Sequence, residues 1–226
     1  MHFEVLVEDA SGKIALSHFL DKILGPDGAS HTRRVIEYKG IGSLPRNLDR
    51  EVDRKKKILL NDLPSLLRGY GRTFRGYGPA YSAAVIVVCD LDQRNHDAFT
   101  AELEGVLNAC DSRPETLFLI AVEEGEAWLL GDRAAVEAAY PDAKSSVLDG
   151  YVQDSICGTW EVLADAVHSR GAIFLKGKGY PEVGIAKGEW AKRIAPLVNV
   201  DRNQSPSFQR FRDEILSIVA NSASLK

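Results

Sequence analysis

The chain lacks the cysteine pattern of a disulfide scaffold or a zinc site. Its three cysteines, Cys89, Cys110 and Cys157, are odd in number, far apart and without a Cys-x-x-Cys pair. This spacing predicts buried thiols in a reducing compartment. The first residues hold no basic segment followed by a long apolar one, and no later run approaches the length of a membrane span. We therefore expect a cytoplasmic protein with no membrane partner.

The sequence also lacks a strong charge of one sign. It has 28 Lys and Arg residues against 32 Asp and Glu residues, a net charge of −4, so no global positive field is available to bind nucleic acid. Any such contact must be local. The five histidines are scattered, and we assign none as a ligand. In 226 residues, 45% hydrophobic content is enough for a large core, so disorder is not expected.

A buried strand with two acids at its end is the main feature of the sequence. Ala83 to Cys89 is a near-continuous apolar run rich in valine and isoleucine, which predicts a central parallel strand buried on both faces. Asp90 and Asp92 follow, where open α/β sheets place their ligand crevices. A bound cation would offset the repulsion and lost solvation of these acids. The alternative is an Asx turn at Asp90 and a helix cap at Asp92, before a helix over residues 94–109.

An earlier strand has the same order of strand, acid and helix. Residues 3–7 form a short apolar strand that ends at Glu8 and Asp9, and a helix is expected over residues 13–24. A second strand is expected over residues 31–39, before the Gly40-Ile-Gly42 break.

A later strand repeats the pattern. Residues 116–122 are apolar, and Glu124 and Glu126 precede helices expected over residues 127–130 and 133–140. Acids at a helix N-terminus are favourable through the helix dipole alone, which is the structural explanation for each of them.

Together these units predict an α/β, Rossmann-like fold with a mostly parallel sheet flanked by helices. Parallel strands bring their carboxyl ends to one edge, so the acids after the three strands are expected to converge. Carboxylates with no histidine or thiolate among them favour Mg²⁺ or Mn²⁺ over zinc.

Two basic stretches lie between the second and the central strand. Residues 54–57, at the start of a helix expected over 53–67, are either a solvated helix face or a phosphate-contacting surface. Residues 68–71 and 75–78 both read Arg-Gly-Tyr-Gly and are expected to form a loop. That loop either stacks on bases and clamps a nucleic-acid strand or is an ordinary crossover. Its candidate nucleic-acid-binding residues are Arg68, Tyr70, Arg72, Arg75 and Tyr77.

The final third of the chain is mainly helical. Helices are expected over residues 158–168 and 207–220, with a glycine-lysine stretch from Lys176 to Gly188 between them. This stretch lacks the order of a P-loop, so its lysines either neutralise a phosphate or are solvated loop residues. We predict residues 1–146 as a metal-binding α/β core and 147–226 as a helical cap packed on the same domain.

The joint order of these motifs resembles the Toprim fold of topoisomerases, primases and OLD-family nucleases. In that fold one strand ends in a glutamate, as Val7-Glu8 does, and a later strand ends in D-x-D, as Asp90-Leu-Asp92 does. Glu124-Gly-Glu126-Ala-Trp-Leu-Leu, Lys187 and the tail Asn203-Gln-Ser-Pro-Ser-Phe look like segments of a Toprim-like family often encoded beside ABC/SMC-type ATPases. OLD-like nucleases often carry a second acid four residues after the first glutamate, and Gly12 stands there instead.

The resemblance implies a metal-dependent nuclease, the Toprim subunit of an ATPase-coupled system for defence against phage, acting on nucleic acid and preferentially DNA. It assigns Glu8, Asp90 and Asp92 to one Mg²⁺ or Mn²⁺ ion, and Glu124 with Glu126 or Asp9 to a second. Lys187 would add positive charge at the transition state. The catalytic residues it implies are Glu8, Asp90, Asp92 and Lys187.

Two other functions remain open. A non-catalytic Toprim-like module that binds nucleic acid or a protein is motivated by the missing acid at Gly12. A glycosyltransferase would use Asp90-Leu-Asp92 to bind the metal of a nucleotide sugar, but this leaves Glu8 and Glu124 unexplained. A haloacid-dehalogenase-type phosphatase is disfavoured because Arg94 stands where its motif needs Thr or Val.

Overall fold

The part of the protein that the structure describes is built on one four-stranded, all-parallel sheet. The computed structural model describes residues 1–49, 53, 55–78 and 80–224. The strands follow the order β2-β1-β3-β4, and Val7 of β1 pairs with Val88 of β3. Their bounds are β1 His2–Val7, β2 Thr32–Glu37, β3 Ala83–Asp90 and β4 Glu115–Ala121. The parallel sheet with flanking helices confirms the predicted α/β, Rossmann-like fold.

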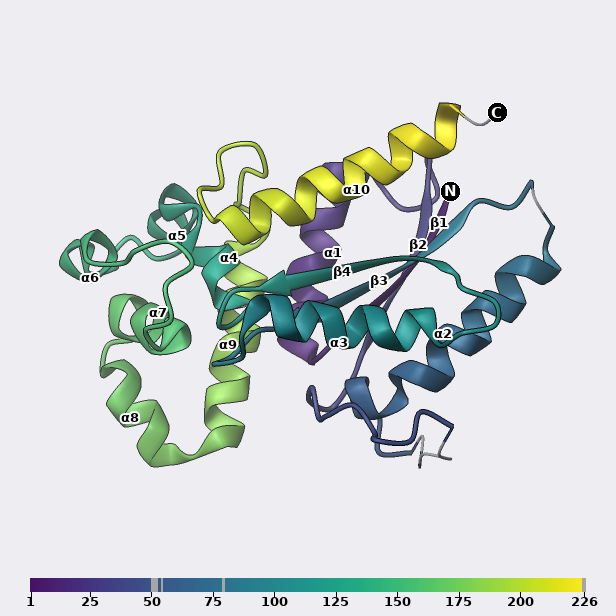
Figure 1. Ribbon diagram of the computed structural model, residues 1–226. Helices are drawn as coiled ribbons and strands as arrows, with labels where there is room; N and C mark the ends of the chain where they lie inside the picture. Colours follow the sequence, from purple (N-terminus) through teal and green to yellow (C-terminus); the bar gives the residue numbers. More distant parts are fainter. Residues whose placement is uncertain (50–52, 54, 79, 225–226) are drawn as a thin grey trace.

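The described part of the chain also forms ten helices. Figure 1 shows α4 to α9 gathered beyond the carboxyl ends of the strands, whereas α1, α2, α3 and α10 lie alongside the sheet. Their bounds are α1 Ala10–Leu24, α2 Leu59–Gly76, α3 His96–Asn108, α4 Glu126–Leu130, α5 Arg133–Ala139, α6 Ser145–Asp149, α7 Thr159–Val167, α8 Gly171–Lys178, α9 Tyr180–Ile194 and α10 Pro206–Ser224. None of them, within the described residues, combines the length and apolar character that a bilayer span requires.

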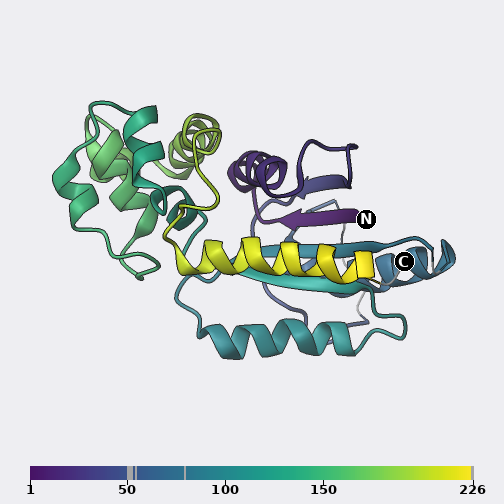
Figure 2. The same ribbon diagram turned by 90° about the horizontal axis from the view of Figure 1, so that it is seen from above.

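Two hydrophobic clusters hold the layers together, one on each face of the sheet. Figure 2 shows α1 and α3 on opposite sides of the strands. The first cluster joins β1 and β3 to α1 and α10, with Phe19 and Phe208 packed edge to face at 5.0 Å between ring centroids. It continues without a break into α5, α7, α8 and α9. The second cluster packs α2 and α3 on the opposite face. Because the first cluster runs from the sheet into the helices near the carboxyl ends, the helical part shares a core with the sheet.

Local capping explains where two helices begin. α1 starts at Ala10, three residues earlier than expected, because the Asp9 carboxylate accepts a hydrogen bond from Gly12 N at 2.7 Å. α3 starts at His96 because Asn95 caps it through Ala98 N. The alternative in which Asp92 caps this helix was therefore wrong.

Residues 68–78, expected as a loop, lie mostly within α2. The helix runs to Gly76 because Tyr70 and Phe74, packed against the second cluster, continue the apolar stripe of its leucines, and Gly71 allows close packing. A Cβ at Gly71 would lie 1.7 Å from the carbonyl oxygen of Ser112. The expected helix start at residue 53 was also wrong, because α2 begins at Leu59. Arg54, part of the predicted basic run, lies outside the described residues.

Two further expectations needed correction. The glycine-lysine stretch is not a loop, since α8 and α9 occupy almost all of it and meet at Gly179, whose φ of 95° suits glycine. Cys89 and Cys110 are buried as expected, but Cys157 is exposed.

Candidate functional site

The acids after β1 and β3 meet at the topological switch point of the sheet. β2 lies on one side of β1, while β3 and β4 lie on the other, so the order in which strands are added to the sheet reverses between β1 and β3. Ligands of open α/β sheets bind in the crevice outside the carboxyl ends of the strands at such a point. Glu8 follows β1 and Asp90 ends β3, and both line a cavity of about 40 Å³.

Helices beyond the sheet complete this cavity. α4 contributes Glu126, and α9 contributes Lys187, whose ammonium group lies 3.0 Å from Glu126 Oε2 and 3.2 Å from Glu124 Oε2. Trp128 and Phe19 provide apolar walls. Residues from four separate parts of the chain are therefore brought together, as the sequence pattern predicted for the acids.

Burial and mutual repulsion change the titration of these groups. Burial, with the negative charges of Asp92 and Asp9 in support, raises the pKa of Glu8 to about 7. Lys187 and the backbone amide of Ile41 act in the opposite direction on the pKa of Glu8. Glu8 Oε2 is buried and has no hydrogen-bond partner among the described residues. Such an atom is costly unless a ligand or proton satisfies it.

Asp90 and Glu124 are affected in the same way. Burial, followed by the charge of Glu8, raises the pKa of Asp90 well above its usual range. Burial raises the pKa of Glu124 to about 7, although Lys187 opposes this rise. Burial alone would lower the pKa of Lys187, but the surrounding carboxylates more than offset that effect and raise it. The ammonium group is therefore charged at neutral pH, while the raised pKa values of Glu8, Asp90 and Glu124 mean that each binds a proton more readily than an ordinary carboxylate.

The remaining two candidate ligands are held by other contacts. Asp9 uses Oδ1 to cap α1 and accepts a hydrogen bond from the Ser11 hydroxyl at 2.7 Å on Oδ2. Asp92, with a positive φ of 50°, is exposed and pairs with Arg94 at 2.8 Å. Asp92 is not among the residues that line the cavity, but it is near enough to raise the pKa of Glu8.

The structure gives a steric reason for Gly12. A Cβ at this position would lie 2.6 Å from Val7 Cγ2 and 3.1 Å from Asp9 Oδ1. An acidic side chain at position 12, as many OLD-like nucleases have, does not fit unless the side chain of Val7 shifts.

The donor atoms of the site suit a hard cation. The cavity presents carboxylate oxygens without histidine or cysteine, and Glu8 Oε2 lacks a partner. As the side chains stand, no three Asp, Glu, His or Cys residues within the described ranges are grouped closely enough to hold a metal ion. In place of a metal ion, the Lys187 ammonium group is the cation that pairs with Glu124 and Glu126.

Contacts between the C-terminal segment and α4, which sequence analysis did not predict, hold Glu126 in place. The Asn203 side chain donates to Trp128 O at 2.8 Å, and Trp128 Nε1 donates to the Ser207 hydroxyl at 2.9 Å. Gly131 packs so closely on Asn203 that a Cβ there would lie 2.0 Å from Asn203 Oδ1. The C-terminal Asn-Gln-Ser-Pro-Ser-Phe segment thus fixes the position of α4, which carries Glu126.

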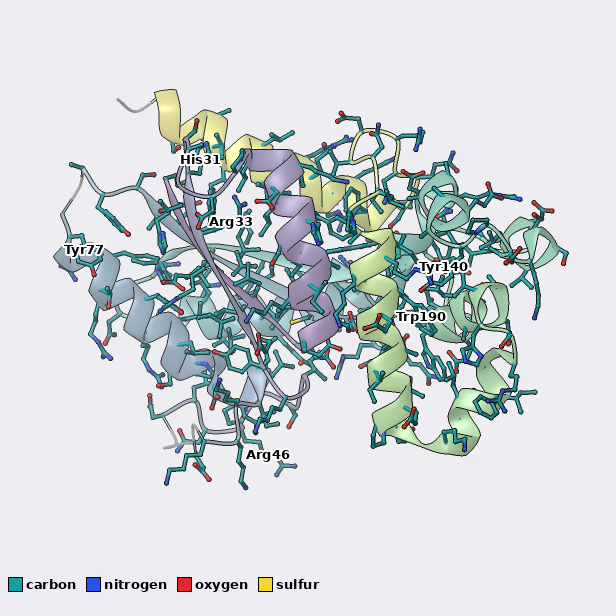
Figure 3. The ribbon with its side chains drawn as sticks, turned by 180° about the vertical axis from the view of Figure 1, so that it is seen from behind. His31, Arg33, Arg46, Tyr77, Tyr140 and Trp190 are labelled. Atoms are coloured by element: carbon teal, nitrogen blue, oxygen red, sulfur yellow. The ribbon has the colours of Figure 1, made fainter. Side chains whose placement is uncertain are left out.

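The arginine-tyrosine residues of α2 are not brought to this cavity. Arg68 donates to Leu48 O at 2.6 Å, and the Tyr70 hydroxyl donates to Glu4 Oε2 at 3.3 Å, so both have structural partners. Tyr77 packs against Tyr81, which precedes β3, and therefore lies at the amino ends of the strands. Figure 3 shows Tyr77 far from α9 and its Trp190.

Arg72 and Arg75 are exposed on the same helix. Because α2 ends near Tyr77, the two arginines also lie toward the amino ends of the strands. Nothing in their placement connects them to the carboxylates.

The comparisons with known proteins give one result. The model of a family described as a domain of unknown function, DUF4276, matches residues 7–216, a span that includes Glu8, Asp90, Glu126 and Lys187. No curated protein and no solved structure matches the chain. Because the matched span covers most of its length, the chain belongs to the DUF4276 family.

Proposed function

We propose that this protein is a divalent-metal-dependent phosphodiester hydrolase that acts on nucleic acid. The observation that carries the proposal is the convergence of Glu8, Asp90 and Glu126 with Lys187 at one cavity, at the switch point of a parallel sheet. Perturbed carboxylates gathered with a buried lysine in such a crevice are typical of a catalytic site. The resemblance to Toprim nucleases supports the same reaction.

The resemblance to the Toprim fold supplies the residues proposed to hold the metal. Glu8, Asp90 and Asp92 are proposed for one Mg²⁺ or Mn²⁺ ion, and Glu124 with Glu126 or Asp9 for a second. When bound, such ions supply an activated water and charge stabilisation on the attacking and leaving oxygens of the phosphodiester. The orphaned Glu8 Oε2 supports this assignment, because a cation would satisfy it.

The protein's own groups contribute charge and proton transfer. Lys187 would stabilise negative charge that develops on the phosphoryl oxygens, since its ammonium group is fixed in the cavity by two carboxylates. Glu8 and Glu124, whose pKa values are raised to about 7 in the metal-free protein, would release their protons when the metal binds, because a ligating carboxylate must be deprotonated.

The cellular setting follows from the resemblance. An ABC/SMC-type ATPase is the proposed partner, defence against phage the proposed role, and the cytoplasm the proposed location. The ATPase would bring the nucleic acid and the nuclease together, which makes activity in its presence the more relevant measurement.

The test is cleavage of plasmid DNA, single-stranded DNA and RNA with Mg²⁺ or Mn²⁺, with and without an ABC/SMC-type ATPase as the proposed partner. We expect cleavage by the wild type and none by Asp90→Asn. Asp201→Asn is the matched control, because Asp201 is exposed and is not one of the residues that line the cavity. Undiminished cleavage by Asp90→Asn would disprove the assignment.

One observation favours a second function, a non-catalytic module that binds nucleic acid or a protein. Lys187 already pairs with Glu124 and Glu126, so an internal cation stabilises this side of the cavity. Retained nucleic-acid binding without cleavage under every metal and partner condition would establish this alternative.

A further inference from the structure

The segment that connects β2 to α2 concentrates positive charge. Residues 39–57 contain seven of the chain's 28 Lys and Arg residues but three of its 32 Asp and Glu residues. The protein as a whole has a net charge of −4, so this segment is a local basic region in an acidic chain.

Backbone hydrogen bonds place this segment beside the acid cavity. Gly40 N donates to Glu8 O at 3.0 Å, and Lys39 N donates to Lys57 O at 2.7 Å. Leu59 N then donates to Gly40 O at 3.1 Å, which ties the start of α2 to the same point. The two ends of the segment therefore lie side by side, immediately next to the first carboxylate of the site.

The lysines of this segment are exposed to solvent. Lys39, Lys55, Lys56 and Lys57 are exposed. No ion pair links Lys39, Lys55 or Lys56 to another residue in the described ranges.

Two more features of the segment bear on its surface. Lys57 has a positive φ of 51°, a conformation that costs free energy in a non-glycine residue, and its charge lies near Glu37, which Lys13 already pairs. Figure 3 shows Arg46 of the same segment extending outward from the body of the protein.

The cavity is too small to hold the nucleic-acid strand, so the strand must be bound by surface outside it. A volume of about 40 Å³ is far below the roughly 300–1,000 Å³ of pockets that enclose a small-molecule ligand, so the cavity does not enclose a nucleotide. A nucleic-acid substrate must therefore lie across the mouth of the cavity, with its other phosphates on neighbouring surface. The carboxylates would repel those phosphates, so a flanking cationic surface is needed to hold the strand.

We infer that Lys39 and Lys57, with Lys55, Lys56 and Arg46, form a phosphate-binding surface for the nucleic-acid strand on the β2 side of the acid cavity. This inference rests on the proposed function in taking a phosphodiester chain as the ligand. A lipid surface is disfavoured, because the large exposed apolar side chains of the described residues include none between positions 39 and 57.

The test is fluorescence-anisotropy binding of labelled single-stranded DNA, duplex DNA and RNA in EDTA, which separates binding from cleavage. The variant is Lys39→Gln/Lys57→Gln, and the control is Arg72→Gln/Arg75→Gln, which removes the same charge from the exposed part of α2. We expect the lysine variant to lose about tenfold in affinity, while the arginine control stays within about twofold. The slope of log affinity against log salt should fall by about 1.5 to 2 for two lost phosphate contacts.

Other outcomes overturn the inference. Unchanged affinity in the lysine variant, an equal loss in the arginine control, or no wild-type binding to any of the three nucleic acids would each do so. Asp90→Asn separates the two claims, because it should bind at least as tightly as the wild type, with one repelling carboxylate fewer, and yet fail to cleave. Binding through the lysines with no metal-dependent cleavage would support the phosphate-binding surface and reject the hydrolase. Cleavage that the lysine variant leaves unaffected would support the hydrolase and reject the phosphate-binding surface.

Discussion

Lys187 on α9 places its ammonium group 3.0 Å from the carboxylate of Glu126 on α4. Both side chains are largely shielded from solvent, and Glu124 lies within 3.2 Å of the same ammonium group. A buried charge is tolerated when it is paired, so each partner depends on the other. This contact joins the helical part of the chain to the acids of the sheet.

Removal of Lys187 should therefore destabilise the protein in a pH-dependent way. We expect Lys187→Met to lower the free energy of unfolding by about 3 kcal/mol at pH 8, because it leaves buried carboxylates unpaired. The loss should be smaller at pH 5, because Glu124, with a pKa raised to about 7, is protonated there. Urea denaturation measures both values. Lys192→Met, on the exposed side of the same helix, should change little, and equal losses at the two pH values would refute the explanation.

The carboxylates should themselves make stability fall as pH rises. The pKa of Glu8 is about 7 in the folded protein against an ordinary value of 4.5, so the native state binds more protons than the unfolded state between these values. In EDTA, the free energy of unfolding should decrease from pH 4.5 to 7. Glu8→Gln should reduce that decrease by about 1–3 kcal/mol.

Glu102→Gln is the control for this titration, because Glu102 is exposed on α3. Urea midpoints collected across the pH range give the two curves. If Glu8→Gln and the wild type lose stability in parallel, Glu8 does not have a raised pKa.

Asn203 should be critical for stability. Its side chain satisfies Trp128 O and accepts from Ser205 N at 3.0 Å, and it is fully buried. Asn203→Ala leaves these groups without partners, so we expect a loss of about 2 kcal/mol by urea denaturation. Asn221→Ala, at an exposed position of α10, should change stability by less than about 0.5 kcal/mol. A similar small effect at Asn203 would contradict its proposed role in fixing the position of α4.

Two glycines of α2 should respond oppositely to alanine. A Cβ at Gly69 meets nothing within 4 Å, so Gly69→Ala should stabilise the helix by about 0.5–1 kcal/mol. A Cβ at Gly71 would lie 1.7 Å from Ser112 O, so Gly71→Ala should destabilise by about 2 kcal/mol. Thermal unfolding distinguishes the two, and shifts of the same sign would show that close packing is not why Gly71 is present.

These glycines also show where sequence interpretation failed. Glycine-rich segments such as residues 68–78 and 176–188 predict loops, because glycine favours turns over helices. In α2 and α9 the buried residues at helical spacing, such as Leu63 with Leu67 and Trp190 with Ile194, outweigh that preference. The close approach at Gly71 depends on Ser112, a tertiary contact that no local pattern contains.

The sheet and its acids were predicted more fully than the rest. Apolar runs such as Ala83 to Cys89 mark buried parallel strands directly, and the carboxyl ends of such strands meet by geometry. The assignment of Lys187 to the site came only from the family resemblance. No local sequence pattern predicts that a lysine of a distant helix contacts Glu124 and Glu126. The basic surface around Lys39 required the backbone contacts of the folded chain.

The most direct test of the central claim is calorimetric titration of the purified protein with Mn²⁺. The wild type and Asp201→Asn should bind the ion, while Asp90→Asn and Glu8→Gln should lose binding at least tenfold, because residues from two strands form one site. Absence of binding by the wild type, or equal binding by Asp90→Asn, would contradict a metal-dependent hydrolase at this cavity.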